Sequence, residues 1–238
     1  MIHSRNTPTK QEGFTIVELM IATLVFSTIL IVISSGVIHF TTAYYKGVHT
    51  SSTQTTARDV MNTISQNMQY GGGNATLVKM DPNDHSVDKY MCIGDVQIDY
   101  KIGAKLGTDS DYGVFVTTVD SSGDCKAYDP SFKSKGRELL TPNMRLTDLS
   151  VTKEKLGVNN LYDVTAGVAF GDLDLLCAHD IPANAKGGCE RSALAFDDYT
   201  AIEAVGKSVA CKGGSGSQFC AFSHLSTQVV ARFEAAKE

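Results

Sequence analysis

The sequence predicts an α+β protein in which one long N-terminal helix packs on an antiparallel β-sheet head. Three observations support this fold class. An apolar stretch occupies residues 14–33, a weaker helical pattern continues to about residue 70, and alternating apolar and polar residues recur in the remainder. A helix lying on an antiparallel sheet lets both elements bury their apolar faces. The chain of 238 residues is long enough for one folded domain with a substantial appendage.

The apolar stretch has the length of a membrane span. Residues 14–33 carry a single charge, Glu18, and contain neither Gly nor Pro. Twenty helical residues rise about 30 Å, the thickness of the hydrocarbon core of a bilayer. The preceding residues are polar and include Arg5 and Lys10. Basic residues at this end predict a cytoplasmic N-terminus and an extracytoplasmic head.

Glu18 is the anomaly within this stretch. A carboxylate inside a membrane helix costs about 2–3 kcal/mol or more, so it marks a functional position by default. If a protease cut after Gly13, the new amino group on Phe14 would lie one helical turn before Glu18. The two charges could then pair, within one chain or between neighbouring chains. The alternative is an ordinary anchor whose acid reaches the headgroups.

The segment GFTIVELMIA, from Gly13 to Ala22, resembles the class III signal of the type IV pilin family. The resemblance implies a pilin-like fold, cleavage between Gly13 and Phe14 by prepilin peptidase, and N-methylation of Phe14. It also implies that Glu18 neutralises the Phe14 amine of an adjacent subunit during assembly. Many pilins carry a proline midway along this helix, where the present chain reads Ser34-Ser35-Gly36.

The resemblance also implies partners and a location. The expected partners are prepilin peptidase, other pilin or pseudopilin subunits and the inner-membrane assembly platform. The protein would first be a single-pass inner-membrane protein with an extracytoplasmic head, and would later enter a pilus or pseudopilus at the cell surface.

A general secretory signal is a second interpretation of the same stretch. Its cleavage site would be the small residues Ser34, Ser35 and Gly36. The apolar run is longer than the usual central region of about 7–15 residues in such signals. This interpretation also leaves Glu18 and the Gly13–Phe14 junction unexplained.

The remaining chain divides into further segments. A leader over residues 1–13 and a transmembrane helix over 14–40 precede an amphipathic continuation over 41–72, ended by Gly71-Gly72-Gly73, and a β-rich head over 73–238. In the continuation, Tyr44, Val48, Val60, Met61, Ile64 and Met68 fall at roughly helical spacing, and the apolar face of residues 57–68 would pack under the head. Strands are expected at residues 96–102, 112–116, 145–151, 161–170 and 227–233. Residues 202–209 fit either a short helix or an edge strand.

Six cysteines all lie in the expected head, which indicates disulfides formed in an oxidising compartment. They are Cys92, Cys125, Cys177, Cys189, Cys211 and Cys220. Their connectivity is open, and proximity favours the pairs Cys211–Cys220, Cys177–Cys189 and Cys92–Cys125. A zinc site from Cys177, His179 and Cys189 is the alternative, although the spacing lacks the Cys-x-x-Cys knuckle of structural zinc sites.

No cofactor and no enzymatic activity are expected. The histidines are scattered, and the sequence contains neither a nucleophile elbow nor a phosphate-binding Gly-Lys loop. Asp172 and Asp174 are calcium candidates, because their side chains would project from one side of a strand. The net charge of −5 does not indicate a general nucleic-acid binder.

Two classes of function follow. The first is a minor pilin or pseudopilin, a structural subunit that initiates, primes or caps a type IV pilus or a type II secretion pseudopilus. The second is a binding module, a tip adhesin or DNA-capturing pilin of a pilus or competence system. The large head, the absent helix proline and the cysteine-rich C-terminal region favour a minor subunit similar to the pseudopilin GspJ and the minor pilin PilW.

Overall fold

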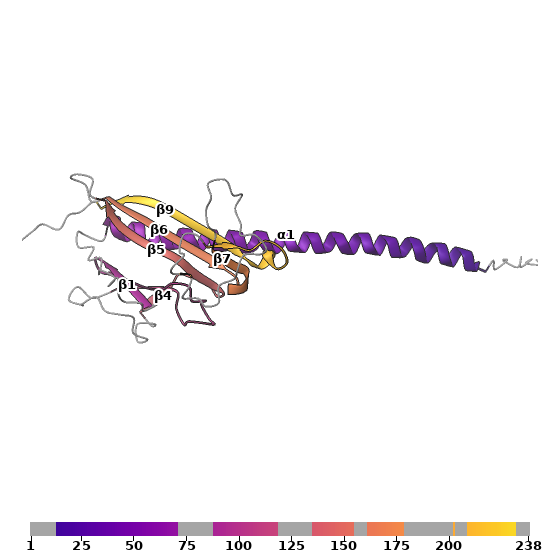
Figure 1. The fold of residues 1–238 in the computed structure, drawn as a ribbon, viewed down its shortest axis with the longest axis horizontal. Coiled ribbons are helices and arrows are strands. Elements are labelled where there is room, and N and C mark those ends of the chain that lie inside the picture. Colours follow the sequence, from indigo (N-terminus) through magenta and orange to yellow (C-terminus); the bar gives the residue numbers. More distant parts are fainter. Residues whose placement is uncertain are drawn as a thin grey trace, which may run out of the picture. The chain divides into compact units, whose positions relative to one another are not determined.

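The computed structural model of the protein describes residues 13–70, 88–118, 135–154, 161–178, 202 and 209–231. The chain forms two compact units, Met1–Tyr44 and Tyr45–Glu238. Helix α1 (Ile16–Tyr70) belongs to both units, and all of the described strands belong to the second (Figure 1). The strands are β1 (Asp88–Ile93), β2 (Val96–Lys101), β3 (Val114–Thr118), β4 (Gly136–Glu138), β5 (Met144–Glu154), β6 (Leu161–Phe170), β7 (Leu176–Ala178), β8 (Val209–Cys211) and β9 (Ala221–Val230). One long helix with antiparallel sheets confirms the α+β prediction.

In the first part of α1, residues 16–48, the side chains are exposed on every side of the helix. It is long and apolar enough to cross a membrane. Its hydroxyl groups donate to carbonyls of the same helix: Thr23 to Met20 at 3.0 Å, and Ser27 to Thr23 at 2.7 Å. Such bonds satisfy polar side chains within the helix, which an apolar surrounding requires.

The second part of α1 buries one face in the head. Its buried residues recur at helical spacing and are Thr53, Thr56, Ala57, Val60, Met61, Ile64 and Met68. Tyr44 and Val48, which share the helical spacing, are exposed and lie outside this buried face. The segment rich in serine and threonine, residues 50–56, is helical, and two of its residues, Thr53 and Thr56, are buried. Thr53 can be buried because its hydroxyl donates to the carbonyl of His49 at 2.8 Å.

The first sheet is an antiparallel meander in the order β1-β2-β3-β4. Strands β2 and β3 lie close to their expected positions, whereas β1 and β4 were not predicted. A two-residue turn at Gly94 and Asp95 joins β1 to β2, and Gly94 has a φ of 59°. A positive φ suits glycine at the first position of such a hairpin turn. On β2, Ile98 and Tyr100 face the common core.

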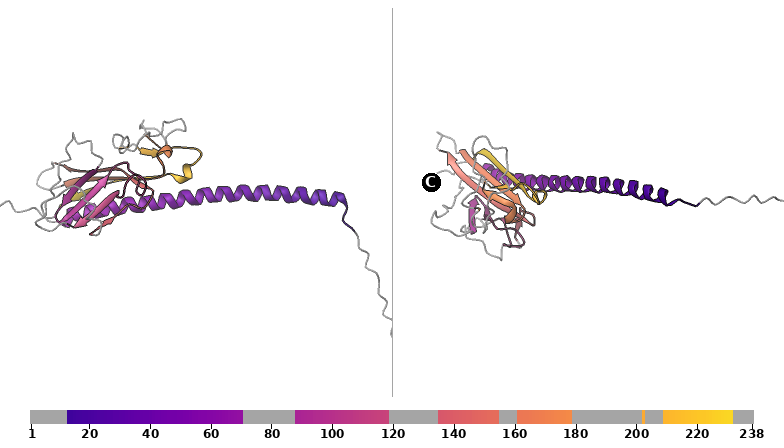
Figure 2. Two further views of the ribbon diagram at one scale, coloured as in Figure 1. Left: turned by 90° about the horizontal axis from the view of Figure 1, so that it is seen from below. Right: turned by 45° about the vertical axis from the view of Figure 1, so that its right-hand side comes forward.

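The second sheet contains β5, β6 and β9, which Figure 2 shows side by side. Strand β6 matches its predicted range, and β5 extends slightly beyond it. The last strand was predicted too late, because β9 begins at Ala221 rather than Thr227. Ser223 and Thr227 lie on the core side of β9, where an alternating pattern would have apolar residues, so the sequence of this strand does not show the alternation. The segment 202–209 was expected to be either a short helix or an edge strand. Its last residue, Val209, is the first residue of β8, which pairs with β7.

A buried arginine ties the two sheets together. Arg145, at the start of β5, is 1% exposed. Its guanidinium donates to the carbonyls of Gly103 at 2.7 Å and Gly171 at 3.2 Å. Gly103 follows β2 and Gly171 follows β6, so this side chain bonds to a segment from each sheet. Burial lowers the pKa of Arg145, and the charges of Asp109 and Asp172 oppose that shift.

Backbone hydrogen bonds also connect the two sheets close to Arg145. Ile102 and Leu146 form a parallel bridge, and the Gly103 N–H donates to the Leu146 carbonyl at 2.7 Å. The Leu106 N–H donates to the Met144 carbonyl at 2.9 Å. Both sheets and α1 therefore contribute side chains to one hydrophobic core.

Arg145→Ala should lower the free energy of unfolding of the head by about 3 kcal/mol, because two buried carbonyls would lose a charged donor. Arg137, exposed on β4, provides a matched control. Arg137→Ala should change the same quantity by less than about 0.5 kcal/mol. Denaturant unfolding followed by circular dichroism measures both. Equal effects of the two substitutions would contradict the role given to Arg145.

Asp99 on β2 is a buried acid on the sheet face opposite Ile98. It is 0% exposed, and its Oδ1 accepts a hydrogen bond from the Gln97 amide at 2.8 Å. Its Oδ2 has no hydrogen-bond partner among the described residues. Loss of hydration raises the pKa of Asp99 to about 6, and the bond from Gln97 opposes this rise.

The stability of the head should depend on the protonation of Asp99. An unfolded aspartate has a pKa of about 3.9, so the protonated acid stabilises the fold fully below about pH 4 and the contribution is lost as the pH rises through about 6. Asp99→Asn should therefore raise the free energy of unfolding by about 2 kcal/mol at about pH 8 and by little at about pH 4. Asp95→Asn, at the exposed turn, should show no such difference. Denaturant unfolding at both pH values measures the effect, and a gain independent of pH would refute this assignment.

Candidate functional site

The Gly13–Phe14 bond lies immediately before α1. Residues 13–15 are not helical, and the helix begins at Ile16. Phe14 is 85% exposed, and among the described residues, the chain neighbours of Gly13 apart, no atom lies within 4 Å of the position that a Cβ on Gly13 would take. Exposed backbone near a chain end, outside regular structure, is accessible to a protease.

Thr15 and Glu18 form reciprocal hydrogen bonds at the start of α1. The backbone N–H and the hydroxyl of Thr15 donate to Glu18 Oε2 at 3.0 and 2.9 Å. The Glu18 N–H donates to Thr15 Oγ1 at 3.3 Å. This arrangement is a capping box, which satisfies N–H groups that lack a partner within the first helical turn. Thr15 is therefore the N-cap of the apolar helix.

The sequence contained a signal for this cap. A Thr-x-x-Glu pattern before an apolar run is the signature of a capping box. From the sequence, Glu18 was interpreted as a charge-pairing residue or as an acid that reaches the headgroups, and Thr15 was given no role.

The capping box leaves part of the Glu18 carboxylate available. Both bonds from Thr15 fall on Oε2, so Oε1 can accept a hydrogen bond from a further donor. The Glu18 side chain is exposed. A positively charged group could therefore pair with Glu18 while the cap is kept. The predicted pairing with the Phe14 amine stays a prediction.

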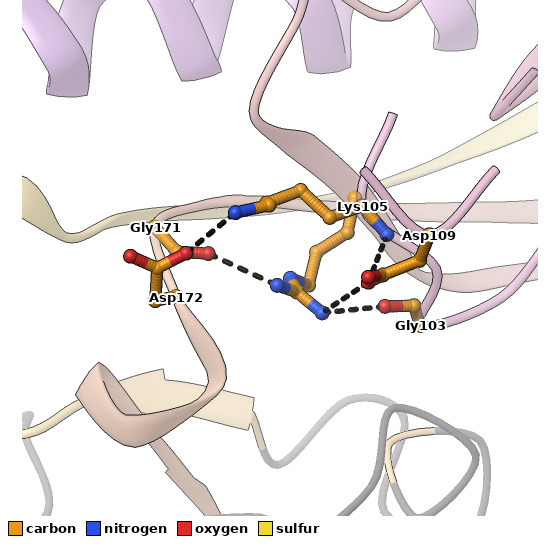
Figure 3. A network of polar contacts seen from close by, with 6 residues as sticks. Gly103, Lys105, Asp109, Gly171 and Asp172 are labelled. Atoms are coloured by element: carbon orange, nitrogen blue, oxygen red, sulfur yellow. Dashed lines mark hydrogen bonds and ion pairs between the residues drawn. The ribbon is translucent and has the colours of Figure 1, made fainter. Parts of the chain in front are cut away.

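Asp172 and Asp174 do not lie on a strand, contrary to expectation. Asp172 precedes the short 3-10 helix η2 (Leu173–Leu175), and Asp174 lies within it. Asp172 Oδ1 accepts a hydrogen bond from Lys105 Nζ at 2.6 Å, as Figure 3 shows. Among the described residues, no group of three His, Cys, Asp or Glu side chains could hold a metal ion. The partner of Asp172 in this structure is an ammonium group.

Cys211 and Cys220 form a disulfide, the pair that proximity favoured. It closes a loop that contains the short 3-10 helix η4 (Ser217–Phe219). Gly214 and Gly216 have φ values of 104° and 87°, which favour glycine in this tight loop.

The structure also settles the state of two other cysteines. Cys92 and Cys177 are disulfide-bonded. Cys177 is thus no thiolate, and the alternative zinc site that included it is wrong. Cys125 and Cys189 lie outside the described residues, so the pairings predicted for them stay predictions.

A group of polar side chains gathers on the face of β5, β6 and β9 opposite the core. Asp148 Oδ2 accepts a hydrogen bond from the Thr165 hydroxyl at 2.9 Å and lies 3.3 Å from His224 Nε2. The Ser150 hydroxyl bonds to Thr165 at 2.8 Å rather than to the histidine. This Asp–His pair was not predicted, because the two residues are far apart in the chain.

Comparison with known proteins gives one match. The family model described as "Prokaryotic N-terminal methylation motif" matches residues 8–34. The chain carries the type IV pilin-like signal. The matched stretch includes the Gly13–Phe14 bond, the capping box and most of the apolar part of α1.

The methylation signal and the apolar helix together indicate a membrane-anchored, type IV pilin-like protein. No curated protein and no solved structure matches the chain. The similarity to GspJ and PilW, which rested on the layout of the chain, stays a prediction.

We expect the capping box to slow hydrogen exchange at the start of α1. Thr15→Ala should speed hydrogen exchange of the Glu18 amide, because this N–H would lose its side-chain acceptor. Thr15→Ser keeps a hydroxyl and should preserve the protection. Nuclear magnetic resonance of the mature chain in detergent micelles measures the exchange rate. Unchanged protection in Thr15→Ala would show that the cap does not form there.

Proposed function

We propose that this protein is a minor pilin or pseudopilin, a structural subunit rather than an enzyme. Prepilin peptidase cleaves it between Gly13 and Phe14 and methylates the new amino group. The apolar part of α1 first holds the protein in the inner membrane with the head on the extracytoplasmic side. The same helix then packs against neighbouring subunits in a type IV pilus or a type II secretion pseudopilus, where the protein initiates, primes or caps the filament.

The observation that supports this proposal most strongly is the coincidence of the methylation signal with the start of α1. The signal covers residues 8–34, and α1 begins at Ile16. An isolated helix with apolar residues on every side needs a membrane or protein neighbours around it. A subunit that leaves the bilayer for a filament exchanges the first surrounding for the second.

The head supports a role outside the cytoplasm. All of its described cysteines are disulfide-bonded. Structural disulfides persist in oxidising compartments and are rare in the cytosol. An extracytoplasmic head also agrees with the basic residues before the apolar stretch.

Glu18 is the assembly residue in this proposal. A mature chain beginning at Phe14 would bring an ammonium group into the apolar filament core, where an unpaired charge is costly. Because the capping box occupies Oε2, Oε1 can receive the amine of the same or an adjacent subunit. The cap and the charge pair can therefore exist together.

The mature chain should begin at N-methylated Phe14 and be lighter by six hydrogens, since its six cysteines would form three disulfides. Intact mass and N-terminal sequencing of the membrane-extracted protein, without reducing agent, measure both. A start near Val37 would indicate a secreted soluble protein, and an uncut Met1 an ordinary anchor. Either result would contradict the filament function.

Two substitutions at Glu18 separate charge from capping. Glu18→Ala removes both, whereas Glu18→Gln keeps a side chain that can complete a capping box but carries no charge. Both variants should be cleaved, and both should incorporate poorly into filaments because the Phe14 amine lacks a counter-charge. The ratio of filament-bound to membrane-bound protein measures incorporation. Normal incorporation of Glu18→Gln would show that the charge pair is not required.

A further inference from the structure

Strand β9 forms one edge of the sheet β5-β6-β9 and is its outermost strand in Figure 1. Among the described strands, β9 pairs only with β6, through consecutive residue pairs from Phe170–Ala221 to Leu161–Val230. In an antiparallel pair, alternate residues turn their N–H and C=O groups toward the neighbouring strand, and the residues between them turn these groups away. One side of β9 therefore offers a row of backbone donors and acceptors to a further strand.

The other edge strands of the described sheets have features that discourage further pairing. Proteins protect sheet edges with charged side chains, proline, bulges or very short strands. Strand β1 contains Lys89, and β4, β7 and β8 have only 3 residues each. Strand β5 contains Arg145 and Lys153, and a bulge between Leu146 and Asp148 interrupts its pairing with β6.

Strand β9 lacks every one of these features. Its 10 residues, AFSHLSTQVV, include no Lys, Arg, Asp, Glu or Pro. Its register with β6 runs without a shift from one end to the other. A long, uncharged edge strand of this kind is a template for pairing with another chain. The composition of β9 therefore suits an edge that is covered when the protein works.

The hydrophobic core is also less enclosed at this edge. Leu149, Ala166 and Leu225 lie in one row across β5, β6 and β9. Leu149 and Ala166 are 3% and 0% exposed, whereas Leu225 is only half-buried, although it packs against the same core. An apolar side chain on a further strand would cover Leu225 and complete the row.

We propose that β9 is a docking site for an extended segment of another protein chain, which joins the sheet as a strand beside β9. Backbone hydrogen bonds supply affinity in this mode of recognition, and side chains at alternate positions supply specificity. The docked segment carries apolar residues on the side of Leu225. On the opposite side it carries hydroxyl or amide residues, because Ser226 and Gln228 are exposed there. The inference concerns the second unit alone and does not depend on the proposed function.

A short blocked peptide in which valine and threonine alternate has this chemistry and serves as the probe. Full-length protein in detergent micelles is titrated into the fluorescently labelled peptide, and micelles without protein correct for partition of the peptide into detergent. The fluorescence anisotropy should rise to saturation. An isotope label at one peptide carbonyl should show the infrared band of a β-sheet when the peptide is bound.

Leu225→Lys distinguishes strand addition from other modes of peptide binding. At a free edge the lysine side chain reaches water, whereas a strand added beside it would bury the ammonium group. This substitution should weaken peptide binding by about tenfold or more, because a buried, unpaired charge is costly. Leu225→Met keeps an apolar side chain of similar volume and should change the affinity by less than about twofold.

Near-ultraviolet circular dichroism checks the fold of each variant. Thr227→Lys, on the same face of β9, replaces Leu225→Lys if that variant does not fold. The inference would be overturned by the absence of saturable binding to the wild-type protein. Binding without the β-sheet band, or unchanged binding by the lysine variant, would overturn it equally.

Discussion

The continuity of α1 is the constraint on which the other features depend. One helix of 55 residues satisfies its own backbone, while its side chains change from apolar on all sides to buried along one face. The first pattern suits a surrounding of lipid or of other helices. The second supplies Val60 and Ile64 to the core of the head. Because the same element belongs to both units, the helix links the environment of the signal to the folded domain.

Polar contacts between the two sheets hold the head together, in addition to its apolar core. Two separate antiparallel sheets could slide relative to each other if only apolar side chains lay between them, since apolar contacts are not directional. Arg145 adds direction, because its planar guanidinium bonds to one carbonyl beyond β2 and another beyond β6. The parallel bridge from Ile102 to Leu146 fixes the backbone at the same place.

The sequence predicted the elements whose signals are local. Residues 161–170 alternate along the whole of β6, and the apolar stretch and its Gly-Phe junction were sufficient to identify the methylation signal. The beginning of β9 was missed because Ser223 lies on the core side and disguises the alternation. Arg145 was missed for a different reason. Its partners are carbonyls of Gly103 and Gly171, and a backbone acceptor leaves no mark in the sequence.

The geometry at Glu18 changes the argument for its function. An acid in an apolar helix was taken to need an external partner because an unpaired carboxylate is costly there. The bonds from Thr15 meet part of that need within the same chain, and they lie at the end of the helix, where the unpaired N–H groups of the first turn favour negative charge. The cost of burying the Glu18 carboxylate therefore does not by itself require a charged partner from a second subunit. The stronger reason for a partner is the amine that cleavage at Gly13 would create, because capping by Thr15 leaves Oε1 of Glu18 able to receive it.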